Sequence, residues 1–139
     1  MQLGKATRIT CGDAAPSATS DVVGTGIDMA NHEGAVFVAK IDAASPDITL
    51  KLQQASQADF SDAVDLPGAT VSSDGTSTTL ILDIHKPYQN RYLRPVVERG
   101  TAAAVAAITV VRYCPRTKPV DNGEPADNSF AAIVSPELD

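Results

Sequence analysis

Apolar and polar residues alternate in several short stretches of this chain, and that period of two predicts β-strands. The clearest stretch is 48–53, whose apolar positions alternate with polar ones, so that one face is buried and the other is wet. Segment 35–41, AVFVAKI, predicts a second strand. The connection between them, DAASPD, has turn composition, and Pro46 forces extended backbone on the residue before it. Two strands joined by so short a connection predict a β-hairpin.

The same alternation returns at 79–85, and a further strand is expected at 91–99 after the turn sequence KPYQN. This pair carries three arginines on its second member. Pro95 cannot donate a hydrogen bond to a neighbouring strand, so the 91–99 strand is expected to be an edge strand or to carry a bulge there.

Segment 103–113 supports two interpretations. Its alanines favour a helix, whereas the β-branched cluster ITVV favours a strand, and we favour a strand from Val105 to Tyr113. TRITC and VVGTGIDM near the start, and Ala69–Val71 within a polar loop, add shorter strands. About eight short strands predict an all-β fold, an antiparallel sandwich or barrel.

Composition fits one domain. The chain has 139 residues, of which 43% are apolar but only 4% are aromatic, so aliphatic side chains must build the core. We expect residues 1–120 to form the β domain, with the first 20 or so as strand or as an extended arm. Residues 121–139 predict an acidic C-terminal arm whose apolar cluster, Phe130 to Val134, docks on its own subunit or on a neighbour. An end without a role is the alternative.

No apolar run reaches the roughly 18 residues of a membrane span, and the N-terminus lacks the layout of a signal peptide. We therefore expect no membrane partner and synthesis in the cytoplasm. Cys11 and Cys114 are expected to be buried thiols in a reducing compartment, with a disulfide as the less favoured outcome.

Charge is segregated along the chain. Residues 1–84 carry a net −7, residues 85–118 a net +6 and residues 119–139 a net −5. A nucleic-acid-binding face would have to be free of acidic competitors, so nucleic acid is not expected as a partner. The pattern suits contact with a complementary protein surface, or cancels within one folded subunit.

Candidate chemistry is sparse. His85 shares a strand face with Asp83, which would orient a general base, but an ordinary exposed pair is the favoured interpretation. Neither His32 in NHEG nor Cys114 in RYCPRT matches a metal-ligand or nucleophile motif, and GTGID lacks the spacing of a phosphate-binding loop. We expect no enzyme activity, no metal and no cofactor.

Four arginines, at 91, 94, 99 and 112, are candidates for partner contact. Arginine is enriched at protein interfaces and forms bidentate hydrogen bonds with carboxylates. They would also suit an anionic ligand, or a solvated edge strand on which charge deters aggregation. The full set of predicted contact residues is Arg91, Arg94, Arg99, Arg112, Phe130, Ile133 and Val134.

The order TLKLQQASQADFSDAVDLPGA, LILDIHKP, RYLRPVVERGTAAAV and VVRYCPRTKPV resembles the decoration, or cement, proteins of tailed-bacteriophage capsids. The likeness covers roughly residues 20–120 and leaves out the acidic tail and the cysteines. It implies a jelly-roll-like β-sandwich that sits on the outer capsid surface of the virion and cements neighbouring major capsid protein subunits. It also implies a homo-oligomer, with a dimer favoured over a trimer. Another phage head or tail protein, or a glycan-binding sandwich on the virion, is the alternative.

Overall fold

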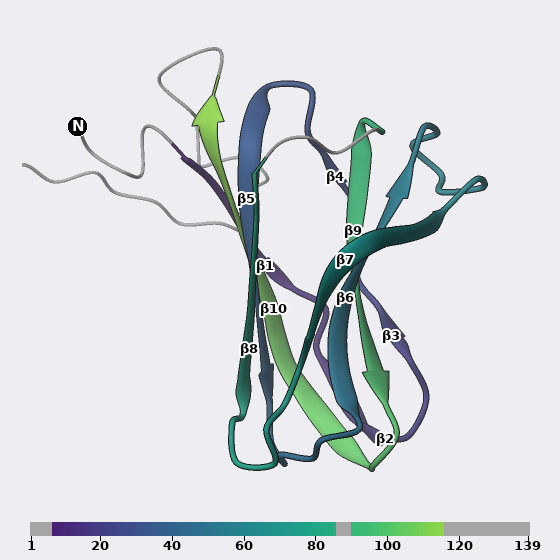
Figure 1. The fold of residues 1–139 in the computed structure, drawn as a ribbon, viewed down its shortest axis with the longest axis vertical. Helices are drawn as coiled ribbons and strands as arrows, with labels where there is room; N and C mark the ends of the chain where they lie inside the picture. Colours follow the sequence, from purple (N-terminus) through teal and green to yellow (C-terminus); the bar gives the residue numbers. More distant parts are fainter. Residues whose placement is uncertain (1–6, 86–89, 116–139) are drawn as a thin grey trace, which may run out of the picture.

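The computed structural model describes residues 7–85 and 90–115, which form two antiparallel β-sheets packed face to face (Figure 1). The ten strands are β1 (Thr7–Gly12), β2 (Ala15–Ala18), β3 (Val22–Val23), β4 (Ile27–Asp28), β5 (His32–Ile41), β6 (Ile48–Ala55), β7 (Val64–Ser72), β8 (Thr79–His85), β9 (Tyr92–Arg99) and β10 (Ala103–Pro115). The part of the chain that the structure describes contains no helix long and apolar enough to cross a membrane.

Strand pairing gives the sandwich the topology of a jelly roll. One sheet has the order β1-β10-β5-β8 with β2 also on β10, and the other has the order β3-β9-β6-β7 with β4 also on β9. If β1 and β2 count as one interrupted strand, and β3 and β4 as another, eight strands pair first with last, second with seventh, third with sixth and fourth with fifth. This nesting is that of two Greek keys folded together. The all-β, jelly-roll-like sandwich predicted from the sequence is confirmed.

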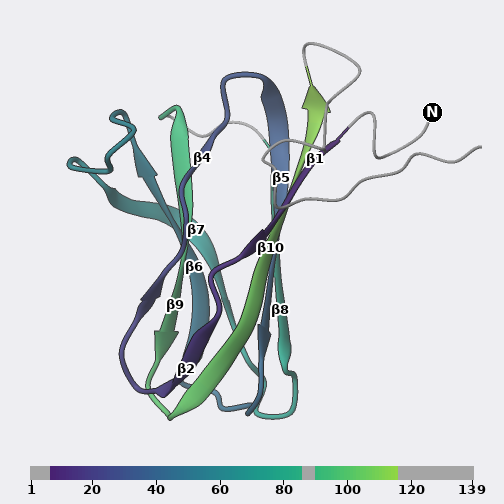
Figure 2. The same ribbon diagram turned by 180° about the vertical axis from the view of Figure 1, so that it is seen from behind.

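The predicted hairpin of 35–41 with 48–53 is wrong. β5 and β6 lie in opposite sheets, so the connection between them crosses between the layers (Figures 1 and 2), and β8 and β9 also lie in opposite sheets. Both members of each pair have an apolar face, and these faces meet across the core. Their hydrogen-bonding partners come from distant sequence, β5 from β8 and β10, and β9 from β6.

Segment 103–115 is a strand, as favoured, and its irregular pattern has a structural cause. The register of β10 against β5 shifts between Val105 and Ala107. The buried positions therefore change from Ala103 and Val105 before the shift to Ile108 and Val110 after it. Such a bulge breaks strict alternation in the sequence.

Pro95 lies within its sheet, so the expectation of an edge strand is wrong, but pairing is irregular beside it: Val23 pairs with Val96 and Ile27 with Leu93, which leaves three residues opposite two. β9 pairs with β6 without a register shift, and with β3 and β4 on its other side. The Pro95 carbonyl accepts a hydrogen bond from the Gly24 amide at 2.8 Å. Because the amide and carbonyl of a strand residue point the same way, the missing N–H faces the gap between β3 and β4 and costs no ladder bond.

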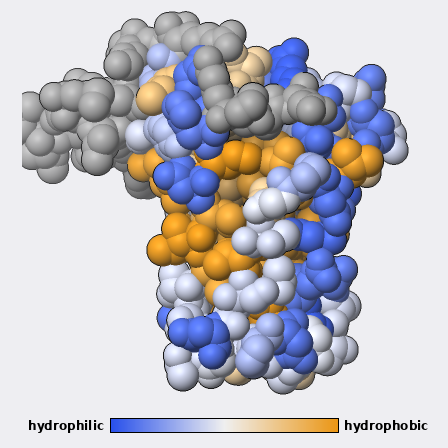
Figure 3. All heavy atoms as spheres, in the orientation of Figure 1, coloured by the Kyte–Doolittle hydropathy of each residue, from blue (hydrophilic) through white to orange (hydrophobic). Residues whose placement is uncertain are grey.

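The core between the sheets is aliphatic apart from Phe37, its one aromatic member among the described residues. The largest fully buried side chains are Phe37, Ile41, Ile48, Leu50, Leu52, Leu80, Leu93, Ile108, Val97, Val105 and Pro95. On the side formed by the edge strands β7 and β8, apolar side chains reach the surface (Figure 3), and Ile81 is 57% exposed.

The described part of the first twenty residues joins the sandwich. β1 and β2 both pair with β10, which favours strand over an extended arm for residues 7–18. The predicted acidic arm at 121–139 lies outside the described residues, as do Phe130, Ile133 and Val134.

Candidate interaction surface

One end of the sandwich carries a cluster of arginine and aromatic side chains, built from Phe60, Arg91, Tyr92 and Arg94. Tyr92 and Arg94 lie two residues apart on β9 and so share its outer face. Phe60, in the β6–β7 connection, meets Tyr92 edge to face with ring centroids 6.3 Å apart. The guanidinium of Arg94 lies 4.8 Å from the Phe60 ring centre, and that of Arg91 lies 5.2 Å from the Tyr92 ring centre. These distances are those of cation–π contacts.

Asp28 of β4 fixes Arg91 through a two-pronged ion pair. Arg91 Nε donates to Asp28 Oδ1 at 2.8 Å and Nη2 donates to Oδ2 at 2.7 Å. The hydrogen bonds from Arg91 hold the pKa of Asp28 below its usual value, and the carboxylate in turn raises the pKa of Arg91. Both side chains are partly exposed, so the pair orients the arginine more than it stabilises the fold.

Arg94 belongs to a polar network on the outer face of the second sheet. Its Nε donates to Gln53 Oε1 at 2.9 Å, and Gln53 donates to Asp65 at 3.0 Å. Lys51 pairs with Asp65 at 3.2 Å and with Glu98 at 2.9 Å. The network spans β7, β6 and β9 and holds Arg94 in one position above Phe60.

Arg99 lies inside the molecule and corrects the prediction that it contacts a partner. Its side chain is 4% exposed, and its donors are engaged by the chain itself. Nε donates to the Ser20 carbonyl at 2.7 Å, while Nη1 donates to the carbonyls of Pro16 at 2.8 Å and Ala103 at 2.6 Å. Arg99 therefore ties the β2–β3 connection to the start of β10.

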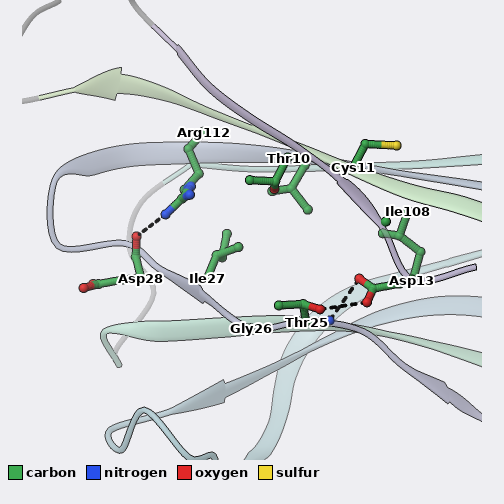
Figure 4. A pocket seen from close by; sticks show the side chains of 11 residues that line it. Thr10, Cys11, Asp13, Thr25, Gly26, Ile27, Asp28, Ile108 and Arg112 are labelled. Atoms are coloured by element: carbon green, nitrogen blue, oxygen red, sulfur yellow. Dashed lines mark hydrogen bonds between the residues drawn. The ribbon is translucent and has the colours of Figure 1, made fainter. Parts of the chain in front are cut away.

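Arg112 lines two adjoining hollows where β1 and β4 flank β10. The crevice in Figure 4 has a volume of about 320 Å³ and is lined by polar and apolar side chains alike. Near its far end, Asp13 accepts hydrogen bonds from the amide of Thr25 at 3.0 Å and from its hydroxyl at 2.8 Å. At the other end, Arg112 Nη1 donates to the Asp28 carbonyl at 2.9 Å.

The second hollow, which we call the arginine pocket, has a volume of about 350 Å³ and lies at the end of the sandwich. It is lined by Arg8, Asp28, Ala30, Asn31, His32, Arg91 and Arg112. Burial, and then the positive charges of Arg112 and Arg8, lower the pKa of His32 to about 4. His32 is therefore neutral near pH 7, and three arginines line the pocket.

His85 and Asp83 form an exposed cluster with Tyr113. The rings of His85 and Tyr113 are stacked with centroids 5.8 Å apart, and the Tyr113 hydroxyl donates to Asp83 Oδ1 at 2.6 Å. Tyr113 on β10 reaches β8 by crossing β5 over Gly34, where any Cβ would lie 2.3 Å from its ring. The cluster is a surface contact between β8 and β10. In it the Asp83 carboxylate already accepts a hydrogen bond from Tyr113.

The prediction that both cysteines are buried is wrong. Cys11 and Cys114 are both exposed and both free. Cys11 lies on the outer side of the edge strand β1, and Cys114 lies near the end of β10 with a φ of 52°. Within residues 7–85 and 90–115, no group of three or more histidine, cysteine, aspartate or glutamate residues is placed to hold a metal ion.

The four predicted arginines therefore do not share one location in the fold. Arg91 and Arg112 both line the arginine pocket, Arg94 lies beside them on β9, and Arg99 is internal. Phe60 and Asp28 were not among the predicted contact residues. Phe60 is an isolated apolar residue in a Ser- and Asp-rich loop, which is the signal that would have marked it for a surface role.

No protein-family model and no curated protein sequence matches this chain. Among solved structures, the chain is similar to the SPBc2 prophage-derived protein YomS, with 13% sequence identity and a TM-score of 0.46. The likeness covers 76% of this chain and 94% of that chain. At this level it carries no conclusion about what this chain does.

Proposed function

We propose that this chain is a structural protein of a tailed-phage virion that binds the outer surface of the capsid and cements neighbouring major capsid protein subunits. The resemblance of its strand and turn sequences to capsid cement proteins motivates the proposal. The observation that carries it is the placement of the aromatic side chains in the folded chain.

Aromatic residues are scarce in this chain, and most of the described ones lie outside the core. Of the four aromatic residues in the described part, Phe37 alone lies in the core, and Phe60, Tyr92 and Tyr113 lie outside it. All three lie towards the end of the sandwich where β9 begins and β10 ends (Figure 1). Tyrosine, phenylalanine and arginine are the residues most enriched at the centres of protein interfaces.

Charge at the same end fits a protein partner. Arg91, Arg94 and Arg112 gather there because the end of β10 and the start of β9 meet at that end of the sandwich. A guanidinium above an aromatic ring presents both an apolar surface and a carboxylate-binding fork. An acidic patch on the major capsid protein would be complementary to it, and a standard contact would bury roughly 800 Å² per partner.

Many repeated contacts with the capsid would give such a cement protein its overall binding strength. A homo-oligomer, with a dimer favoured over a trimer, would hold two copies of the cluster against adjacent capsid subunits, so that each contact is weak but their combination is strong. The protein would be made in the host cytoplasm and reach the outer capsid surface after the shell has formed.

Binding to undecorated shells tests the proposal. Purified protein is mixed with shells of the cognate major capsid protein, sedimented to measure affinity, and imaged by electron cryomicroscopy. The double variant Tyr92→Ala/Arg94→Ala should bind at least tenfold more weakly, since hot-spot truncations cost about 2 kcal/mol or more. Lys40→Ala, which removes a charge at the opposite end of the sandwich, is the matched control and should bind like the wild type.

Absence of density on the shell surface would rule the proposal out. Equal affinity of the double variant and the control would leave a capsid role but move it off this cluster. Clear hits on a glycan array together with no shell binding would point instead to a sugar-binding sandwich.

A further inference from the structure

β8 forms one border of its sheet and presents one side of its backbone to a further strand. Its seven residues pair with β5 in an unbroken register, from Thr79 opposite Lys40 to His85 opposite Gly34. On its other side, β8 pairs with none of the strands in the part of the chain that the structure describes. Every second amide and carbonyl of β8 points to that side, and such a row is a template for pairing with another strand.

Apolar side chains are accessible on both faces of this border. Ile81, on the outer face, is 57% exposed. Leu82 and Ile84, on the inner face, are only partly buried and line a hollow of about 220 Å³ beside Pro67 and Gly68 of β7. Figure 3 shows apolar surface on this side of the sandwich, where β7 and β8 are the edge strands. A strand added beside β8 would cover both faces at once, because its side chains alternate between the same two faces.

The sequence of β8, TLILDIH, is complementary to itself when a second copy runs antiparallel about a two-fold axis at Leu82. All seven residues then have a residue of the partner directly opposite. On the inner face, Leu82 meets the partner's Leu82, and Leu80 meets the partner's Ile84 at each end. Every pair on that face is therefore apolar, and the partly buried side chains lose their contact with water.

The outer face also favours this register. Ile81 meets the partner's Asp83, and Thr79 meets the partner's His85, so no like charges of β8 lie opposite each other. An axis at Asp83 would place two carboxylates directly opposite each other, and an axis at Ile81 would leave two residues of each strand unpaired. An axis between two residues would bring the inner face of one copy beside the outer face of the other.

We propose that two copies of this chain pair along β8, about a two-fold axis at Leu82, so that their first sheets join into one. A two-fold interface uses the same patch on both copies and closes on itself, so association stops at the dimer. The inference names the surface of the homo-oligomer, and the use of that dimer on a capsid rests on the proposed function. β8 ends at the same end of the sandwich as the arginine and aromatic cluster (Figure 1), so antiparallel pairing would place the two clusters at opposite ends of the dimer.

Sedimentation equilibrium of the full-length chain, without shells, tests the pairing. One strand pair buries less than the roughly 800 Å² per partner of a standard interface, so the wild type should dimerise with a Kd of about 10–100 μM. Ile81→Asp places a carboxylate opposite the partner's Asp83 twice in each dimer and should raise the Kd at least tenfold. Val64→Asp, which changes a side chain of β7 that is 53% exposed, is the matched control and should leave the Kd unchanged.

A charge reversal makes this test specific to the register. Ile81→Asp/Asp83→Lys places opposite charges across from each other at both sites, and should return the Kd to within about threefold of the wild type. A variant that stays as weak as Ile81→Asp would contradict the axis at Leu82.

Disulfide formation reports the register directly, because directly opposed residues of antiparallel strands have Cα atoms about 4.5–5.5 Å apart, within the range of a disulfide. In a Cys11→Ser/Cys114→Ser background, Leu82→Cys should oxidise to a covalent dimer. Thr79→Cys faces the partner's His85 and should not cross-link, whereas Thr79→Cys/His85→Cys should. Far-UV circular dichroism checks that each variant is folded.

A chain that stays monomeric up to about 1 mM would overturn the inference. So would a dimer that Ile81→Asp and Val64→Asp weaken equally, or a cross-link that Thr79→Cys forms as readily as Leu82→Cys. The outcome is separable from the capsid role: a β8 dimer that binds no shell would support the pairing and refute the proposed function, and a monomer that binds shells would do the reverse.

Discussion

Replacing Arg99 with methionine tests whether this arginine holds the jelly roll together from within. The substitution keeps the apolar stem and the approximate volume but removes every donor. In the wild type, three backbone carbonyls accept from the guanidinium, those of Ser20, Pro16 and Ala103, at 2.6–2.8 Å. The variant leaves all three without this partner.

The expected loss follows from which carbonyls can find water. Pro16 and Ser20 are exposed, so their carbonyls rehydrate at little cost. Ala103 is 1% exposed, and a buried carbonyl left without a donor costs about 1–3 kcal/mol. Loosening of the β2–β3 connection adds about 1 kcal/mol, as for other lost anchoring hydrogen bonds. We expect Arg99→Met to lower the free energy of unfolding by about 2–4 kcal/mol.

Urea unfolding followed by far-UV circular dichroism measures this loss, since the chain has no tryptophan. With a slope of about 2 kcal/mol per molar urea, the midpoint should fall by about 1–2 M. Arg94→Met, on the same strand but on the outer face, should cost less than about 1 kcal/mol because its contacts are partly exposed. A midpoint for Arg99→Met no lower than that of Arg94→Met would refute the internal role.

Three further predictions follow from the described residues. Because His32 has a pKa of about 4 when folded and an ordinary value of 6.5 when unfolded, the unfolded chain binds the extra proton first. Stability should therefore be full above pH 6.5 and fall by up to about 3 kcal/mol as the pH drops to 4, a dependence that His32→Gln should flatten in urea titrations. Gly34→Val should displace the Tyr113 ring that crosses it and cost about 1–3 kcal/mol by overpacking, whereas Tyr113→Phe should cost less than about 1.5 kcal/mol; equal costs would contradict the crossing geometry. Native protein should react with two equivalents of a thiol reagent through Cys11 and Cys114 without denaturant, and a reaction that requires unfolding would contradict their exposure.

The strands themselves were predictable because each has a local signature, but their partners were not. Alternation marked 48–53 and 79–85 correctly, since each has one buried and one wet face. The hairpin prediction failed because most pairing in a jelly roll joins strands distant in sequence, and a short connection looks the same whether it turns within a sheet or crosses to the other. The composition of a connection does not distinguish these two cases.

The internal role of Arg99 was hidden for a related reason. β9 is buried on both faces at Val96 and Val97, which are only 2% and 0% exposed, so adjacent apolar residues there obscure the inward side of the strand. The arginine pocket depends on register between β1 and β10, which no local pattern contains. The surface arginines at 91, 94 and 112 were recognisable as candidates by residue type, and their shared location came only with the fold.

Two edge strands of the sandwich, β7 and β8, differ in their tendency to pair with a strand of another molecule. β7 is protected against pairing with another strand, because Pro67 and Gly68 interrupt its regular pairing with β6 and bend it. β8 is straight, fully extended and carries the exposed Ile81, with Asp83 and His85 as its main deterrents. Concentrated samples should therefore self-associate first along β8.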